Sequence, residues 1–367
     1  MVNMGMWRLI RPDASSILDD PGVIRGMPRY VDVVRGKRLP KWLISRSLPL
    51  EYDWNAPTRE LWERHEEGMA RYSEVESLQD ADNKGQVADT ASSSLLDLKV
   101  DLGRRIVSDC HLCERRCGVD RLAGEKGYCG CGDTFALSSY FPHMGEEPEL
   151  IPSGTIFTCG CTIRCIHCQN WEISQWRERG YDVNTESMAA IVEDLHGKGC
   201  RNVNMVGGDP TPNLSLWLST IRNVNTSVAT IWNSNSYYSD EAAKLLSGFI
   251  DLYLLDFKYG NNECAEAISD APGYWDVCRR NHLTAQDNGE LLIRVLVLPG
   301  HNECCTRPIL EWISESLGPW TRVNLMFQYR PEWRARERSD LRQRLTQKEI
   351  AEARAIAREA GLLNLVH

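Results

Sequence analysis

From residue 154 onward, short apolar runs alternate with stretches that have the pattern of amphipathic helices, such as residues 186–196 and 240–246. The apolar runs are typical of buried strands and occupy residues 155–158, 203–206, 228–232, 251–255, 291–298 and 323–327. Alternating strands and helices favour an α/β fold with a parallel sheet. Because these six runs are too few to close an eight-stranded barrel, we predict a curved, partial (β/α)6 barrel.

Outside this region the composition changes in steps along the chain. A mixed N-terminal extension, which we expect to be helical, is followed by a polar stretch rich in Asp and Ser, which is typical of a flexible linker. A cysteine-rich segment then precedes the barrel, and a charged helical pattern that stops at Gly361 follows it. The extension, linker, cysteine-rich segment, barrel and C-terminal helix with its tail occupy residues 1–74, 75–95, 96–150, 151–335 and 336–367.

Polar groups stand where most of the predicted strands end. The first strand ends in a cysteine loop, and the others that end in this way are followed by residues 207–210, 233–236, 256–258 and 328–331. The remaining strand carries Arg294 within it and finishes at residues 299–302. In α/β barrels the chemistry lies at the carboxyl ends of the strands. We therefore expect these groups to face one common mouth.

Glycine and asparagine at this mouth suit ligand binding. Gly207 and Gly208 would let a ligand approach bare backbone, although a tight turn alone would explain such a pair. Asn233 and Asn235 can hydrogen-bond hydroxyl groups or the polar end of an amino acid.

Three charged residues at the mouth need partners. Asp256 and Lys258 are two residues apart on a strand, so both project to the same face, where they could also form a simple ion pair. Arg294 lies in an otherwise apolar strand and is costly to bury unless it is paired. A ligand carboxylate would suit its forked guanidinium.

The loop after the first strand contains Cys161, Cys165 and Cys168, spaced C-x3-C-x2-C. Three thiolates on such a loop can hold three corners of a [4Fe–4S] cluster and leave the fourth iron open. A zinc knuckle is the alternative, but zinc sites usually pair C-x2-C with a second pair further along the chain.

A second cysteine group precedes the barrel. Cys110, Cys113, Cys117 and Cys129 could close a tetrahedral site, for which zinc and a second iron–sulfur cluster are both suitable. Buried thiols without a metal are a third interpretation, since free cysteine is often simply buried.

The composition of the whole chain narrows the class of protein. A net charge of −9 argues against a general nucleic-acid binder, because binding phosphates needs clustered Lys and Arg. No apolar run is long enough to span a bilayer, and the first residues lack a signal-peptide core. Of the 14 cysteines, 9 fall between Cys110 and Cys168, a clustering typical of metal ligation in a reducing compartment. We therefore expect a cytoplasmic protein that acts without a membrane or nucleic acid.

The cysteine loop resembles the signature of radical S-adenosylmethionine (SAM) enzymes. Residues 165–174 look like the branch known as pyruvate formate-lyase activating-enzyme-like, and the likeness extends over about residues 108–330. It implies a [4Fe–4S] cluster whose open iron binds SAM. It further implies that one electron from a low-potential donor of the ferredoxin or flavodoxin type splits SAM into methionine and a 5′-deoxyadenosyl radical, which abstracts a hydrogen atom.

The same resemblance assigns roles to individual residues. Residues 207–209 match the motif that holds the SAM amino group, with Asp209 where Glu is more usual. Asp256 and Lys258 match an Asp-x-Lys pair of the activating enzymes, and Arg294 matches a strand arginine near the methionine carboxylate. His167 occupies the position at which an aromatic residue commonly packs beside adenine.

Two functional hypotheses follow. The first is a radical SAM enzyme that abstracts hydrogen from an unidentified substrate, which could be a protein glycine, as for a glycyl-radical activase. The second is a non-enzymatic iron–sulfur or zinc-binding electron-transfer protein, which would leave the strand-end residues without a purpose.

Overall fold

The computed structural model describes residues 7–82 and 93–366. Its centre is a curved eight-stranded sheet in the order β3-β1-β2-β4-β5-β6-β7-β8. Every pairing from β2 through β8 is parallel. The parallel strands are β2 (Ser153–Thr158), β4 (Asn202–Met205), β5 (Ala229–Ser234), β6 (Leu252–Asp256), β7 (Glu290–Leu296) and β8 (Arg322–Met326). These are the six strands that the apolar runs predict, and the α/β partial barrel is confirmed.

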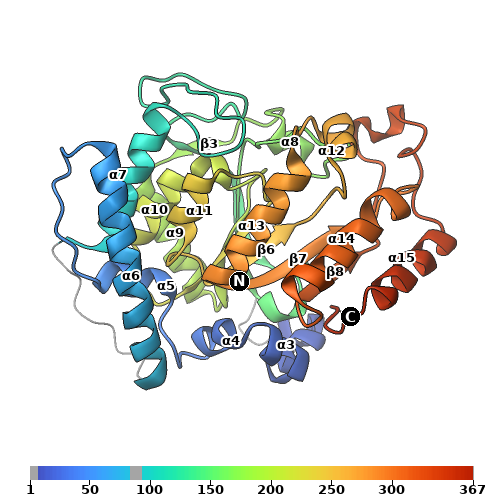
Figure 1. The fold of residues 1–367 in the computed structure, drawn as a ribbon, viewed down its shortest axis with the longest axis horizontal. Coiled ribbons are helices and arrows are strands. Elements are labelled where there is room, and N and C mark those ends of the chain that lie inside the picture. Colours follow the sequence, from blue (N-terminus) through green and yellow to red (C-terminus); the bar gives the residue numbers. More distant parts are fainter. Residues whose placement is uncertain (1–6, 83–92, 367) are drawn as a thin grey trace.

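Helices cover the outer face of the parallel strands (Figure 1). Along the chain the helices from the cysteine loop onward are α8 (Trp171–Ser174), α9 (Thr185–Gly197), α10 (Leu214–Arg222), α11 (Asp240–Leu246), α12 (Asn262–Ser269), α13 (Tyr274–Asn288), α14 (Arg307–Trp312) and α15 (Gln347–Glu359). The short α8 lies at the end of the barrel that carries the cysteine loop. Trp217 and Leu218 of α10 and Leu245 and Leu246 of α11 are fully buried in the layer between helices and sheet.

Two further strands extend the sheet beyond β2. β1 (Phe135–His143) pairs antiparallel with β2, and β3 (Tyr181–Val183) pairs antiparallel with β1. The sequence analysis did not predict either strand. β1 has an irregular burial pattern and a register shift between Leu137 and Ser139, so its apolar residues do not alternate cleanly.

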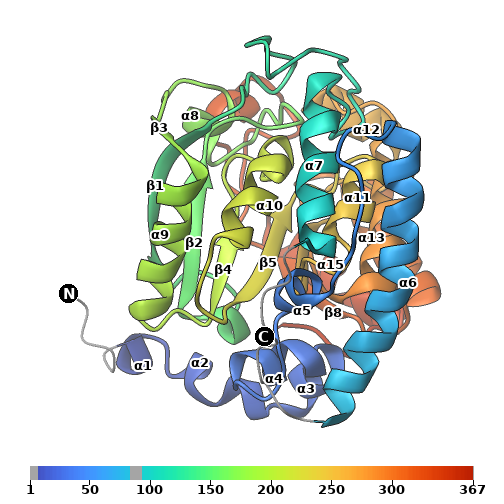
Figure 2. The same cartoon turned by 90° about the vertical axis from the view of Figure 1, so that its left-hand side faces the viewer.

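The described part of the N-terminal extension is helical, and part of it closes the base of the barrel. Its helices are α1 (Trp7–Ile10), α2 (Asp13–Ser16), α3 (Pro21–Gly26), α4 (Pro28–Val34), α5 (Lys41–Ser47) and α6 (Thr58–Asp82), and they are followed by α7 (Leu95–Ser108). α7 packs against α10 on the outer side of the barrel, and α6 packs against α7. Figure 2 shows α3 and α4 across the ends of the strands. Met27 and Tyr30 are fully buried there, in one apolar cluster with Ile231, Leu254 and Leu292 of the barrel. Burying each such side chain stabilises the fold by about 1.5–3 kcal/mol.

The prediction of a flexible linker is wrong for the first part of residues 75–95. Residues 75–82, which we expected to be flexible, form the last turns of α6, whereas residues 83–92 lie outside the described residues. Glu76 is 2.6 Å from Lys41, and Asp80 lies 3.1 Å from Arg29 and from Arg38. The acidic residues of this stretch therefore pair with the N-terminal helices, which the composition of the stretch alone does not reveal.

The cysteine-rich segment contains more regular structure than its name suggests. α7 and β1 occupy much of residues 96–150, and the cysteines of this segment lie on the loop between these elements. Ser94 begins α7 with a capping box, in which its side chain and that of Asp97 each accept a backbone N–H of the other. Among the described helices, none is both long enough and apolar enough to cross a membrane.

Candidate functional site

The cysteine loop lies at the carboxyl end of β2, where it forms one side of a cavity of about 210 Å³. This cavity gathers the residues that the sequence analysis placed at one mouth. Those that line it are Cys161, Cys165, His167, Cys168, Gly207, Gly208, Asn233, Asn235, Asp256, Lys258 and Arg294. Much of the remaining wall is formed by Gln169, Asn170, Met326 and Gln328. In the sequence, the only sign of their role is their position, which is just after the cysteine loop for the first two and at the end of β8 for the others.

The three cysteines of the loop fit a multi-iron cluster better than a single metal ion. Within the described part of the chain, their sulfur atoms do not form a set that lies within 4.8 Å of one another. Thiolates on one tetrahedral ion would, because metal–sulfur distances are about 2.3 Å. Burial raises the pKa of Cys168 to about 11 and also raises the pKa values of Cys161 and Cys165. Buried thiolates therefore need a cationic partner, and a [4Fe–4S] cluster meets both requirements.

Polar side chains approach two of these sulfur atoms. Asn235 donates from Nδ2 to Cys161 Sγ over 3.5 Å, and Ser174 Oγ lies 3.3 Å from Cys168 Sγ. Hydrogen bonds to sulfur are one of the ways in which proteins set the potential of an iron–sulfur cluster. Ser174, on the short helix α8, was missed by sequence reasoning.

The glycine pair after β4 brings backbone close to the cysteine loop. The N–H of Gly208 donates to the Thr158 carbonyl over 2.8 Å, and Gly207 has a φ of +73°. A Cβ atom on Gly208 would lie 2.4 Å from the carbonyl oxygen of Gly160. A side chain at position 208 would therefore separate the turn from the loop.

Asp209 does not line the cavity, although its resemblance to the SAM-amino motif led us to expect contact with ligand. Its carboxylate is buried and accepts hydrogen bonds from Ser234 Oγ at 2.9 Å, Asn235 N at 3.0 Å and Thr211 N at 3.1 Å. Burial raises the pKa of Asp209 above its ordinary value, although these hydrogen bonds oppose the shift. Asp209 therefore lies outside the cavity lining and holds in place the turn after β5 that contains Asn235.

Asp256 and Lys258 form a close ion pair at the cavity wall, with Lys258 Nζ 2.6 Å from Asp256 Oδ2. Burial by itself would lower the pKa of Lys258, but the charge of Asp256 outweighs it and the pKa lies above its ordinary value. The lysine is therefore a permanent cation beside the cysteine loop.

His167 is buried and neutral. Its Nε2 lies 3.1 Å from the Tyr259 hydroxyl, and its ring meets that of Tyr329 edge-on. Burial and the positive charge of Lys258 lower the pKa of His167 to about 3. An uncharged ring at this wall is suited to packing against a flat heterocycle.

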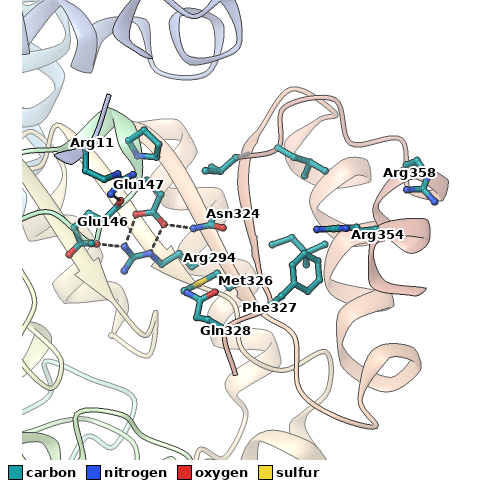
Figure 3. Close-up of a pocket in the computed structure, with 15 residues that line it drawn as sticks. Arg11, Glu146, Glu147, Arg294, Asn324, Met326, Phe327, Gln328, Arg354 and Arg358 are labelled. Atoms are coloured by element: carbon teal, nitrogen blue, oxygen red, sulfur yellow. Dashed lines mark hydrogen bonds and ion pairs between the residues drawn. The ribbon is translucent and has the colours of Figure 1, made fainter. Parts of the chain in front are cut away.

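Arg294 is already paired with carboxylates of the chain. Its Nε and Nη2 contact the two carboxylate oxygens of Glu147 at 2.7 and 2.6 Å, and Nη2 also pairs with Glu146 (Figure 3). Its Nη1 lies 3.4 Å from Asn233 Oδ1. Arg294 thus has the ion-pair partners that its burial requires, before any ligand carboxylate is considered.

A second, larger cavity of about 690 Å³ also adjoins Arg294 (Figure 3). Arg294, Met326 and Gln328 line both cavities. On its far side the larger cavity is bordered by Arg354 and Arg358 of α15. Within the described residues, neither of these arginines has an ion-pair partner within 4.0 Å.

The four cysteines of the second group lie in one region of the structure, but their sulfur atoms do not surround a single point. Burial raises the pKa of Cys113, and the neighbouring Cys129, Cys110 and Cys117 raise it further, so the four side chains share one region. Within the described ranges, no three of them have sulfur atoms that all lie within 4.8 Å of one another. A zinc ion or second cluster at these residues stays a prediction.

The chain is similar to one protein-family model and to two proteins of known sequence. Residues 155–313 match the model of the Radical SAM superfamily. The uncharacterised protein MJ0674 of Methanocaldococcus jannaschii is 40% identical over 341 residues, which cover 91% of this chain and 97% of that protein. The uncharacterised protein MJ0808 of the same organism is 24% identical over 181 residues, which cover 44% and 52% of the two chains.

Solved structures also resemble part of the chain. They include Streptococcus suis SuiB bound to the precursor peptide SuiA, with a TM-score of 0.43 and 14% identity over 56% of this chain and 46% of that chain. SuiB bound to S-adenosylmethionine gives a TM-score of 0.41 and 13% identity over 56% and 47% of the two chains. The matched region thus spans about half the length of SuiB.

The matched domain contains the cysteine loop and most of the cavity wall, and such a domain implies a [4Fe–4S] cluster and SAM. Residues 155–313 are thus a Radical SAM superfamily domain, and over nearly its whole length this chain belongs to one family with the M. jannaschii protein MJ0674.

Proposed function

We propose that this protein binds a [4Fe–4S] cluster at Cys161, Cys165 and Cys168 and cleaves SAM to abstract hydrogen from a peptide substrate, in the manner of a glycyl-radical activase. One observation carries the proposal: the three thiols and the polar ends of the neighbouring strands line a single cavity of about 210 Å³. When bound, the cluster would pass one electron from a low-potential donor to SAM, which would yield methionine and a 5′-deoxyadenosyl radical able to take a hydrogen atom from the substrate.

Different residues of the cavity wall would bind different parts of SAM. The backbone at Gly207 and Gly208 offers peptide groups to its amino end, and the cation of Lys258 offers a partner for negative charge. His167 offers a neutral ring to adenine, because its pKa is near 3. Asn233, beside the Arg294 guanidinium, is suited to the carboxylate of the methionine moiety.

The larger cavity is suited to the substrate. It shares Arg294, Met326 and Gln328 with the smaller cavity, so a molecule bound in it would lie beside the wall that we assign to SAM. Arg354 and Arg358 give its outer side a positive charge (Figure 3). These features favour a substrate that carries a carboxylate at the end remote from the reacting group.

An unpaired strand edge favours an extended peptide over a compact molecule. β8 ends the sheet, and within the described residues its outer edge pairs with the C-terminal segment at Val323, which donates to the Asn364 carbonyl and accepts from Val366 N–H. Because alternate residues of a strand turn the same way, the N–H and C=O of Leu325 also point outward. Leu325 lines the larger cavity, and a peptide could add there as a further strand.

The first test is SAM cleavage. The protein is reconstituted anaerobically with iron and sulfide, reduced with dithionite and mixed with SAM, and 5′-deoxyadenosine is quantified. We expect product from the wild type and from Cys200→Ala, a buried cysteine outside the cavity, but none from the Cys161/Cys165/Cys168 triple alanine variant. Wild-type protein that forms its cluster yet fails to bind SAM would contradict the proposal and favour the electron-transfer alternative.

The second test addresses the substrate. Mixed-sequence peptides with a central glycine deuterated at Cα should transfer deuterium into 5′-deoxyadenosine, and N-methylation of alternate peptide bonds should prevent this by blocking strand addition. Cleavage of SAM without deuterium transfer from any peptide of the mixture would leave radical chemistry intact and exclude the glycine substrate.

A further inference from the structure

We propose that Cys264, His301 and Cys304 form a second metal site, which binds a divalent ion of the zinc class and is separate from the cluster loop. Their ligand atoms all lie within 4.8 Å of one another. The two sulfur atoms are 4.0 Å apart. Neither the proposed radical chemistry nor the cysteine-rich segment before the barrel uses these residues.

The donor set and its spacing match zinc. Two thiolates and one imidazole are a known zinc ligand set, which leaves a fourth position for another ligand. Tetrahedral coordination at metal–sulfur distances of about 2.3 Å places two sulfur atoms roughly 3.8 Å apart. The observed separation of 4.0 Å therefore needs almost no movement to accept the ion.

His301 is held in the tautomer that a metal requires. Its Nδ1 lies 2.7 Å from the Pro299 carbonyl oxygen, and because a carbonyl can only accept, Nδ1 carries the proton. The lone pair is then on Nε2. Metal-binding histidines commonly donate their other ring N–H in this way, which fixes the orientation of the ring. Asp340 Oδ2 lies 3.7 Å from His301 Nε2 and accepts from Arg338 Nη2 over 2.6 Å.

One asparagine joins the two segments that carry the cysteines. Asn261 is the N-cap of α12, and its Oδ1 accepts from the Cys264 N–H over 2.7 Å. Its Nδ2 donates to the Cys304 carbonyl over 2.8 Å. The thiols are thus brought together by hydrogen bonds that do not involve sulfur, so their proximity is built into the fold.

The site lies on the same end of the barrel as the candidate active site. Cys264 follows β6, whereas His301 and Cys304 follow β7. Tyr259, which contacts His167, lies on the connection that leads from β6 to Cys264. An ion here would therefore tie together two strand-end loops beside the wall that we assign to adenine.

The test uses the full-length protein, purified anaerobically, with zinc and iron measured per chain and the affinity for zinc measured by competition with a chromophoric chelator. Cys304 is exposed and Cys264 is half-exposed, so Cys304→Ser and Cys264→Ser should fold normally. We expect each variant to lose one zinc ion per chain and to keep the iron of the wild type. Cys200→Ser, at a buried cysteine elsewhere, should keep both metals.

Cobalt gives a second readout that does not depend on activity. Co²⁺ in the site should show a thiolate-to-metal absorption band that weakens in Cys304→Ser and shifts in His301→Gln. Equal zinc content and affinity in the wild type and in both serine variants would overturn the proposal. A disulfide between Cys264 and Cys304 in the anaerobically purified protein, detected by mass spectrometry, would overturn it as well.

Discussion

Replacing Arg294 with methionine should destabilise the protein by removing the cation between two buried carboxylates. The side chains of Glu146 and Glu147 are 7% and 2% exposed, so their charges depend on the guanidinium for compensation. Asn204 and Asn324 would remain as hydrogen-bond donors to these carboxylates. Removing one partner of a buried ion pair typically costs 3–5 kcal/mol, and we expect Arg294→Met to lower the free energy of unfolding by about that much at pH 7.

The pKa of Glu146 reflects the same cluster of charges. Burial alone would raise it, but Arg294 and His143 lower it to about 2 from an ordinary value of 4.5. This difference corresponds to about 3 kcal/mol, at 1.36 kcal/mol for each pH unit. Because the folded-state pKa is lowered, the stabilisation is present above pH 4.5 and is lost as the pH falls toward 2. The penalty of Arg294→Met should therefore shrink over the same range.

Urea unfolding of the metal-free, reduced protein, followed by tryptophan fluorescence and circular dichroism, measures these free energies. The control is the triple variant Arg294→Met/Glu146→Gln/Glu147→Gln, which has no unpaired charge and should recover most of the loss. A loss below about 1 kcal/mol at pH 7, or a triple variant no more stable than the single one, would refute the reasoning. A triple variant that regains stability but not SAM affinity would assign Arg294 to the ligand as well.

Three other substitutions test separate features. Asp209→Asn replaces a carboxylate that accepts from three donors with an amide, so one hydrogen bond is lost at a cost of about 1–3 kcal/mol. SAM affinity, measured by titration, should fall roughly tenfold. An unchanged affinity would contradict the positioning role of Asp209. Gly208→Ala should prevent cluster assembly, seen as lost iron absorbance, because its Cβ would meet the Gly160 carbonyl at 2.4 Å; normal assembly would show that the turn can move. Burial lowers the pKa of Lys99 to about 7, so the folded protein releases this proton before the unfolded chain does, and unfolding free energy should rise from pH 7 toward 10.5. In Lys99→Met this rise should disappear from urea titrations, and its persistence would assign it to other groups.

The parallel strands and their polar ends could be predicted because both signals are local. Each strand is a short apolar run, and the rule that carboxyl ends of parallel strands meet at one face places the cysteine loop, the glycine pair and the Asp256–Lys258 pair together. The helices α3 and α4 gave no such signal, because the sequence of a helix does not reveal which part of the protein its apolar face packs against. Their place at the base of the barrel depends on contacts between Met27 and Tyr30 and strands that lie some 200 residues further along the chain.

The charged residues of the site show the same limit more sharply. Sequence reasoning required a partner for Arg294 and chose a ligand carboxylate, because an apolar strand offers none nearby. The partners are Glu146 and Glu147, which the turn before β2 brings across the sheet to Arg294. Glu147 also accepts from Asn324 of β8, so one carboxylate links β7 to the edge strand that lines the larger cavity. Any carboxylate that binds Arg294 from either cavity must share the guanidinium with Glu147, so a single side chain with a paired charge stands between the two cavities.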